Sequence, residues 1–563
     1  MTISDHQVRV AEYIIDESGI ADVLATAMRT SPRGRPQNPS SVRLMLIGLY
    51  LSIGNSRLAT LTEAYNVLTR KIPIDTQVRL GVSVLDDTEP CGYRTVVKYS
   101  QLKYTSKTFT KALAYGRSAS DVDPDERERR RRVLQDMADR TMDVFDLDFT
   151  GTVMALDATG IWSWLKSTRG KKQSIDRDVH SEVDADGVTM PPAARDSEVP
   201  DDPEEEGLCF GKGQRDPDAA TGYKTAKSGE SEWFFGYEEH TLVRSVGTDE
   251  AKQMEPPLIA RFTVTPASTD VVEPSLMLLD SLTTPATDLL VDRHYSYKDP
   301  HRWWDELHDR AIDQHLDLRV DEQGFVEVDR LRFAAGCAHC PATPDDLGTI
   351  TRPGPGTPNR EAALEECSTR IELRERYVAK RMVRPERDGK HRVQCPALAG
   401  SIGCPLRPGT VQAAHEHGVP IVENPPAADS AEGLPAICTQ QTVTVSPPDN
   451  TRKLIQRLYW ASRKWTAMWN KRTYVEGSYG NRKNASTEAL RRGLFRVTGL
   501  HWVMLVMTLV NANYNHRMLR NWHDRTGLGD PTHPLLRPEV RSHYVEMTDD
   551  EVRTHLECAA ERA

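Results

Sequence analysis

The sequence predicts an α/β protein, and three features along its 563 residues support that class. Apolar residues recur at helical spacing through residues 8–115, short apolar runs typical of strands follow between residues 152 and 291, and helical periodicity returns over residues 451–524. At about 150 residues per domain, this length allows three or four structural units. Hydrophobic residues (38%) and the 35 Gly and 35 Pro stay near average usage, which argues against collagen, coiled coil and general disorder.

The first 140 residues are expected to form a helical domain. Val42, Met45, Leu46 and Leu49 share one helical face after a start signal at residues 38–41. Residues 118–132 are polar and typical of a linker that enters a helix. A domain boundary is therefore expected near residue 140.

The short apolar runs between residues 141 and 300 predict one sheet, and two of the expected strands end in aspartate. Residues 152–156 are followed by Asp157, and residues 289–291 by Asp292. A buried run that ends in a carboxylate places a hard oxygen ligand for a divalent cation at the edge of the sheet. The alternative is that each acid only caps a helix or ends a strand in solvent.

Charge is distributed unevenly along the chain. Residues 173–207 hold twelve acids and two arginines, which accounts for the whole formal charge of −10. This segment has several prolines and almost no large apolar residues, so we expect a disordered acidic loop that interrupts the sheet. Residues 452–483, in contrast, hold nine Lys or Arg and one acid, which is the local basic patch expected of a nucleic-acid partner.

Four residues of that basic region share one helical stripe. Trp469, Arg472, Glu476 and Lys483 have the spacing W-x2-R-x3-E-x6-K, which keeps them on one face provided that the helix continues through Gly480. An acid flanked by a guanidinium, an ammonium and an indole suits a metal-assisted phosphodiester site. The alternative is an exposed helix with an i,i+4 ion pair worth a few tenths of a kcal/mol.

Together these residues resemble the DDE transposases of bacterial and archaeal insertion sequences, in the group with the signature Y-x2-R-x3-E-x6-K. Asp157, Asp292 and Glu476 match the three acids, and Tyr295 matches a tyrosine that usually lies three positions after the second acid. The signature tyrosine is replaced by Trp469 here. The segments at residues 216–219 (Asp-Pro-Asp-Ala) and 235–240, which ends in His240, also resemble common segments of this family.

The resemblance implies a ribonuclease-H-like mixed sheet core with a helical N-terminal domain that binds DNA and an inserted subdomain rich in strands and loops. Asp157, Asp292 and Glu476 would hold two Mg²⁺ or Mn²⁺ ions about 4 Å apart. Trp469, Arg472 and Lys483 would contact DNA and its phosphates. His240 and Tyr295 are candidate accessory residues, although a histidine in this position is more often structural.

The implied division of the chain is a helical domain at 1–140, the first part of the core at 141–300, the insertion at 301–450, the helical end of the core at 451–524 and a tail at 525–563. The implied reaction is hydrolysis at transposon ends, which frees a 3′-hydroxyl, followed by attack of that hydroxyl on target DNA. The implied partner is double-stranded DNA, bound by a homodimer. The alternatives are a non-catalytic DNA-binding descendant of a transposase, or a ribonuclease-H-like nuclease without strand transfer.

The nine cysteines do not form the dense pattern of a secreted disulfide framework. Cys337-x2-Cys340 and Cys395-x8-Cys404 in the insertion are candidate ligands of a structural Zn²⁺. Because the second spacing is loose, the alternative is a set of reduced, partly buried thiols.

No membrane segment is expected. The longest strongly apolar stretch, residues 502–510, is far shorter than the roughly 20 residues of a membrane-spanning helix. Asp5, His6, Arg9 and Glu12 occupy the place where a signal peptide needs an apolar core. We therefore expect a cytoplasmic protein that associates with the nucleoid when it binds DNA.

Overall fold

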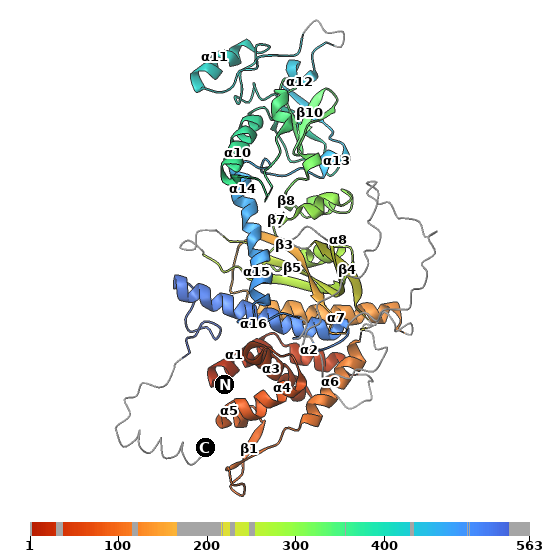
Figure 1. Cartoon of the computed structure of the whole chain (residues 1–563), viewed down its shortest axis with the longest axis vertical. Coiled ribbons are helices and arrows are strands. Elements are labelled where there is room, and N and C mark those ends of the chain that lie inside the picture. The colour runs from red at the N-terminus through yellow and green to blue at the C-terminus, as the bar shows by residue number, and fades with distance from the viewer. Residues whose placement is uncertain are drawn as a thin grey trace, which may run out of the picture.

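The computed structural model describes residues 3–29, 38–114, 122–165, 216, 218–225, 231–246, 254–354, 356–427, 433–491, 494 and 496–539. The N-terminal helices lie at one end of the molecule, the main sheet lies in the middle and the insertion lies at the other end (Figure 1). The acidic segment at 173–207 and the last part of the tail, from residue 540, lie outside the described residues.

The N-terminal region is helical, as the periodicity predicts. A capping box at Ser4 begins the first helix and the side chain of Asn38 caps the third, whose central residues are almost all buried. The elements are α1 (Asp5–Glu17), α2 (Ile20–Ala27), α3 (Pro39–Ser56), α4 (Leu61–Asn66), a π-helical turn (Val67–Lys71), α5 (Ile74–Arg79), the hairpin β1 (Ser83–Leu85) and β2 (Tyr93–Thr95), and α6 (Tyr99–Leu113).

The central sheet is mixed, which confirms the α/β class. Its strands are β3 (Val153–Trp162), β4 (Ala220–Thr225), β5 (Ser231–Arg244), β6 (Ile259–Pro266), β7 (Asp288–Val291) and β8 (Asp313–Leu316). The order is β4-β5-β3-β7-β8, and β6 also pairs with β5. The pairs β3–β5, β4–β5 and β5–β6 are antiparallel, whereas β3–β7 and β7–β8 are parallel.

Two strands are longer than the sequence predicts. β3 continues from residue 153 to residue 162, so Asp157 lies within the strand rather than at its end. The runs at 233–237 and 241–246 belong to one continuous strand, β5. The second half of β3 was not predicted because it includes polar residues and so lacks a continuous apolar run. Polar side chains in a strand can form hydrogen bonds instead of packing in an apolar core.

Successive residues of the strands face two different hydrophobic cores, as the pleat requires. Ala155, Val243 and Leu290 belong to the core shared with the N-terminal helices. Met154, Leu156, Leu242, Leu289 and Val291 belong to the core shared with the insertion. Residues separated by an even number of positions on one strand therefore lie on the same face of the sheet.

Helices α7 (Pro124–Asp143) and α16 (Leu500–Thr526) cover the first face and lie between the sheet and the N-terminal helices (Figure 1). The apolar stretch at residues 502–510 lies in the first half of α16, and all of its residues are buried. The amide of Asn515 donates to and accepts from the backbone of Ile259 at 2.9 Å each, so α16 is fixed to β6. Helix α7 packs on β6 and α16 and also on α2, so it connects the core to the N-terminal helices, and the boundary predicted near residue 140 falls close to its end.

Helix α8 (Val272–Asp280) packs on the second face, and a 3₁₀ helix (Arg293–Tyr297), α9 (Trp304–Asp309) and β8 complete the core. The sequence analysis assigned β8 to the insertion. Its polar residues Gln314 and His315 are buried through bonds to Trp303 (3.2 Å) and Asp288 (2.7 Å), and such long-range partners are invisible in the sequence.

The insertion contains two three-stranded antiparallel sheets, ordered β11-β10-β9 and β12-β13-β14, as its predicted β-rich character suggests. It also contains a long helix, α10, that the sequence analysis did not predict. The described elements are η5 (Val320–Glu322), β9 (Val326–Val328), β10 (Leu331–Ala334), β11 (Cys337–His339), η6 (Asp345–Thr349), α10 (Arg360–Arg376), β12 (Lys380–Arg381), β13 (His391–Gln394), α11 (Pro408–His417), α12 (Ala436–Thr439), β14 (Thr442–Val445) and α13 (Asp449–Arg452).

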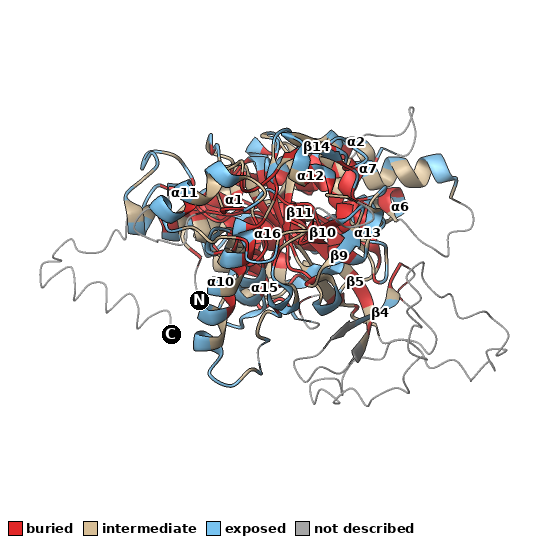
Figure 2. Ribbon diagram, turned by 90° about the horizontal axis from the view of Figure 1, so that it is seen from above, coloured by how far each residue is buried: buried red, intermediate tan, exposed pale blue. Residues whose placement is uncertain are grey.

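Burial follows this organisation. Buried residues gather in the interior of the molecule, whereas α11 is largely exposed at the periphery (Figure 2). Within the described ranges, no single helix is long and apolar enough to cross a membrane, although the helical segments Pro39–Ser56 and Leu61–Lys71, bent by 97°, meet the length and composition requirement as a pair.

Candidate functional site

Strand register places two of the predicted acids side by side. β3 and β7 run parallel with Ala155 opposite Leu290, so two residues further along Asp157 lies opposite Asp292. Asp157 lies two residues after Ala155, and Asp292 lies two residues after Leu290. Both acids therefore point to the face of the sheet that Ala155 and Leu290 occupy. Asp292 follows the last residue of β7, and its Oδ1 accepts a hydrogen bond from the His294 N–H at 3.0 Å.

The third acid arrives on a helix that crosses this same face. The chain runs through α14 (Arg463–Trp469), η7 (Asn470–Arg472) and α15 (Thr473–Lys483), so the helix does continue through Gly480. Tyr479 is buried, and its hydroxyl donates to the Asp157 carbonyl at 2.7 Å. Lys483 Nζ donates to Thr159 Oγ1 of β3 at 2.8 Å, which fixes the end of α15 over the strand.

Arg472 lies between the acids. Its guanidinium forms an ion pair with Asp157 at 3.6 Å and donates to Glu476 Oε1 one turn along the helix. The Arg472 side chain is only 13% exposed, whereas that of Glu476 is 49% exposed. The arginine therefore neutralises part of the negative charge that the two acids bring to this face.

The electrostatics of Asp157 show that the three acids form one group. The pKa of Asp157 is raised to about 7, chiefly by burial and then by the charge of Asp292, with a smaller contribution from Glu476; Arg472 and the N–H of Ala158 oppose these effects. A carboxyl group with neighbours of like charge is stabilised in its charged form by a bound cation.

The donor set fits hard divalent cations, since Mg²⁺ and Mn²⁺ prefer carboxylate oxygens. Among the described residues, no three His, Cys, Asp or Glu side chains are grouped closely enough to hold a metal ion as they stand. At this site the ion pairs of Arg472 occupy two of the three carboxylates. A cation bound by Asp157, Asp292 and Glu476 would compete with Arg472 for the carboxylates of Asp157 and Glu476.

Trp469 contacts this group without pointing to an open surface. Its ring stacks on Trp465 with centroids 5.2 Å apart and planes at 13°, and the Arg472 guanidinium lies 5.4 Å from its centroid. Its Nε1 donates to the carbonyl of Val291, the residue before Asp292, at 3.4 Å. These contacts make Trp469 a packing residue that supports Asp292 and Arg472.

The two candidate accessory residues lie elsewhere. His240 lies two residues from Leu242 on β5 and therefore on the same face as Leu242. This is the opposite face of the sheet from Asp157. It is fully buried, it bonds Thr265 Oγ1 at 2.9 Å, and burial lowers its pKa to about 4. Tyr295 is buried in the second core, where it contacts Trp303 and bonds Ser275 at 3.0 Å. Both residues are structural.

One acid beside the site, Asp317, was not predicted from the sequence. Asp317 follows β8 in the position that Asp292 has after β7, but it is paired with Arg293 at 2.9 Å and with the Trp460 Nε1 at 3.0 Å. Its 5% exposed side chain is therefore a structural acid beside the site. A strand end followed by Asp was the available signal, since residues 316–317 repeat the pattern at residues 291–292.

A buried network anchors α15 beneath the site. Arg482 and Glu239, both fully buried, form an ion pair at 2.6 Å, and Asn511 of α16 donates to the same Glu239 oxygen at 2.8 Å. Glu239 lies on the face of β5 that carries the acids. The Asp-Pro-Asp-Ala segment is also structural: Asp216 accepts from the Gly499 N–H at 2.9 Å and Asp218 from the Leu500 N–H at 2.8 Å, which caps α16.

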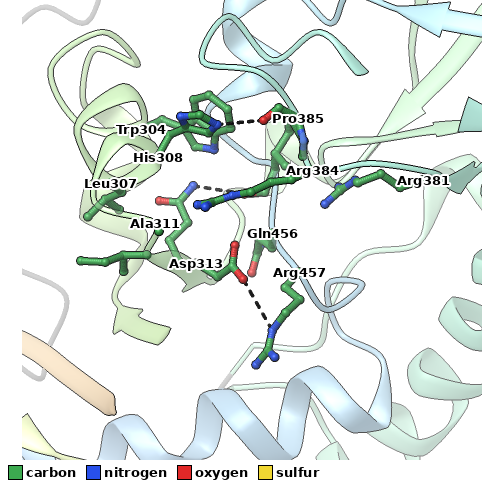
Figure 3. Close-up of a pocket in the computed structure, with 13 residues that line it drawn as sticks. Trp304, Leu307, His308, Ala311, Asp313, Arg381, Arg384, Pro385, Gln456 and Arg457 are labelled. Carbon is green, nitrogen blue, oxygen red and sulfur yellow. Dashed lines mark hydrogen bonds and ion pairs between the residues drawn. The ribbon is translucent and has the colours of Figure 1, made fainter. Parts of the chain in front are cut away.

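A cavity beside the insertion does not contain the acids. A cavity of about 330 Å³ lies between α9, β8 and the segments at 381–385 and 455–457, and Arg381, Arg384 and Arg457 line it (Figure 3). Arg457 forms an ion pair with Asp313 at 3.8 Å at its mouth. The three acids instead lie outside this cavity, on the face of the sheet that α15 crosses.

Three of the four candidate zinc ligands, Cys340, Cys395 and Cys404, line one small cavity in the insertion. Cys337 lines a different cavity, beside Arg381 and Glu375. The two cysteines of the predicted Cys337-x2-Cys340 half-site therefore line different cavities in this structure.

Comparisons of this chain with protein-family models, with curated proteins and with solved structures find no match.

Proposed function

We propose that this chain is a DDE-type DNA transposase with a ribonuclease-H-like core. The observation that carries the proposal is the placement of Asp157 and Asp292 side by side on one face of the sheet, under a helix that brings Glu476 and Arg472 to them. The mixed sheet, in which antiparallel β5 and β6 flank β3 on one side and parallel β7 and β8 on the other, supports the proposed fold.

The proposed chemistry is in-line displacement at phosphorus. Water attacks a phosphodiester, the bond to the 3′ oxygen breaks, and that oxygen takes a proton to become a 3′-hydroxyl. The hydroxyl then loses its proton as its oxygen attacks a phosphodiester of the target, where the bond from phosphorus to the target's own 3′ oxygen breaks and that oxygen takes a proton, so no bond to the protein forms. Divalent ions held by Asp157, Asp292 and Glu476 would stabilise the charge on the attacking and leaving oxygens.

The remaining residues of the stripe would hold DNA. Arg472, released from Asp157, and Lys483 would contact phosphate oxygens, since guanidinium and ammonium groups are the usual phosphate donors. A transposon has two ends, and both must be processed. We therefore propose that two copies of the chain act together on double-stranded DNA in the cytoplasm. The proposal of a homodimer is based on this need to process two transposon ends.

Cleavage and joining of DNA test the proposal. The substrate is a supercoiled plasmid that carries the genomic DNA flanking the coding sequence, incubated with the full chain and Mg²⁺ or Mn²⁺. The native chain should release 3′-hydroxyl ends and join them to target DNA. Asp157→Asn, Asp292→Asn and Glu476→Gln should each lower the rate by at least about 10³-fold while DNA binding changes little.

Glu273→Gln is the matched control, because Glu273 is an exposed acid on α8 at the other face of the sheet. Its rate should equal that of the native chain. Cutting without joining would favour the nuclease alternative. Salt-sensitive DNA binding without metal-dependent cutting would favour the non-catalytic descendant, and cutting that survives in all three acid variants would refute the site.

A further inference from the structure

Four cysteines from separate segments of the insertion surround one small cavity. Cys340 follows β11, Cys395 follows β13, Cys404 precedes α11 and Cys438 lies in α12. The rest of the lining is mainly apolar and includes Ile402 and Ile437. The accessible space is about 10 Å³, which is room for one small occupant.

The backbone around these thiols resembles that of metal-binding knuckles. Cys340, Cys395 and Cys404 are each followed by proline. Proline has no N–H, so the next donor is two residues beyond the cysteine. The N–H of Ala342 bonds the Cys340 sulfur, and those of Leu406 and Arg407 bond the Cys404 sulfur, and each of these bonds lowers the pKa of its thiol.

The four thiols line one small and mainly apolar cavity. A divalent cation binds thiolates directly, so an ion in this cavity would have four sulfur ligands around it.

We infer that Cys340, Cys395, Cys404 and Cys438 bind one structural Zn²⁺. Binding replaces four S–H bonds by four Zn–S bonds of about 2.3 Å and releases four protons. The site then carries two net negative charges, and Arg407 and Arg330 lie close enough to Cys438 to offset them. Since the sulfurs do not yet form a close group, they turn toward the centre of the cavity when the ion binds.

Such a site would join the two small sheets of the insertion. β11 belongs to one sheet and β13 to the other, and Cys438 adds the segment before β14. Small units with limited cores often depend on a metal for stability, and tetrahedral Cys₄ sites are common structural zinc sites. The inference is independent of DNA cleavage, because none of its ligands lies near Asp157, Asp292 or Glu476 in the fold.

Metal content of the full chain tests the inference. Protein purified without chelators should contain one zinc per chain by elemental analysis, and stepwise titration with a mercurial should release it as four thiolates react. Cys340→Ser and Cys438→Ser should each lower the zinc content by at least about tenfold. Cys337→Ser and Cys367→Ser are matched controls from the same insertion and should keep one zinc per chain.

A cobalt-exchanged native chain gives a second measurement that does not depend on folding of the variants. Its absorption spectrum should show tetrahedral Co²⁺ with four thiolate ligands. Zinc-free native protein, cysteines paired as disulfides, or a zinc content that falls with Cys337→Ser but not with Cys438→Ser would each overturn the inference.

Discussion

Arg472 is the side chain on which the balance of charge at the candidate site depends. It pairs with both Asp157 and Glu476 and is almost covered by its surroundings. The arginine occupies the position of positive charge that a bound cation would take. The two therefore compete, and release of Arg472 would make it available to DNA at the moment when the ion binds.

Arg472→Ala should raise the affinity for Mg²⁺ on the order of tenfold, because the competing charge is removed and the repulsion among the acids is left uncompensated. The measurement is the rise of the melting temperature with Mg²⁺ concentration. Arg463→Ala is the control, since Arg463 pairs with Glu365 and Glu372 on the insertion. A weaker response to Mg²⁺ in Arg472→Ala would contradict this role.

Trp469 gives a second prediction for a single side chain. Because it stacks on Trp465 and bonds the backbone beside Asp292, Trp469→Ala should lower the free energy of unfolding by about 3 kcal/mol. Trp469→Tyr keeps a ring in the stack and should lose about 1 kcal/mol. Thermal melting and cleavage rate are measured on both variants. A stable Ala variant that cleaves roughly 10- to 100-fold more slowly would instead indicate base stacking.

The strands and helices that carry the acids were largely predictable, for reasons that particular residues make clear. Residues 289–291 are a continuous apolar run in a four-residue strand buried on both faces, so the position of Asp292 followed directly. The stripe from Arg472 to Lys483 followed from helical geometry. Which strands are neighbours did not follow, because the pairing of β3 with β7 joins segments separated by β4, β5 and β6.

The elements that were missed lack an apolar pattern. In α10 the buried residues Cys367, Ile371 and Arg374 have helical spacing, but one of the three is charged, so the apolar pattern is weak. β8 buries polar residues that find partners only in the folded chain. The cluster of four cysteines around one cavity could not be read from spacing, since Cys438 is brought to the other three cysteines only by the folding of α12.

Helix α16 supplies a prediction about pH. His501 at its start is 4% exposed and packs on Phe109 and Trp502, and burial, with a smaller effect of Arg130, lowers its pKa to about 3. The unfolded chain binds the proton near pH 6.5 and the folded chain does not, so stability is lost as pH falls from about 6.5 toward 3.

His501→Leu should remove this dependence and reduce the acid-induced loss of unfolding free energy by up to roughly 4 kcal/mol. Denaturant unfolding at a series of pH values from 7 to 4 measures the effect. Leucine is close to histidine in size, so at pH 7 the two proteins should have similar stability. Parallel curves for the two proteins across this range would contradict a buried neutral histidine.

At the scale of the whole molecule, α15 crosses one face of the central sheet in the middle of the molecule (Figure 1). The N-terminal helices and α16 lie toward one end and the insertion toward the other (Figure 1). The Arg-lined cavity beside α9 lies on the side of the insertion (Figure 3). This arrangement would allow a duplex to contact the acids while both ends of the protein contact flanking DNA.

The most direct test is anomalous X-ray diffraction from crystals of the full chain grown with Mn²⁺ and a short DNA duplex. The account predicts manganese on the carboxylate oxygens of Asp157, shared with Asp292 and Glu476, and Arg472 displaced from Asp157 toward a phosphate. Bound duplex with no manganese on this face, and with Arg472 still paired to Asp157 and Glu476, would contradict it.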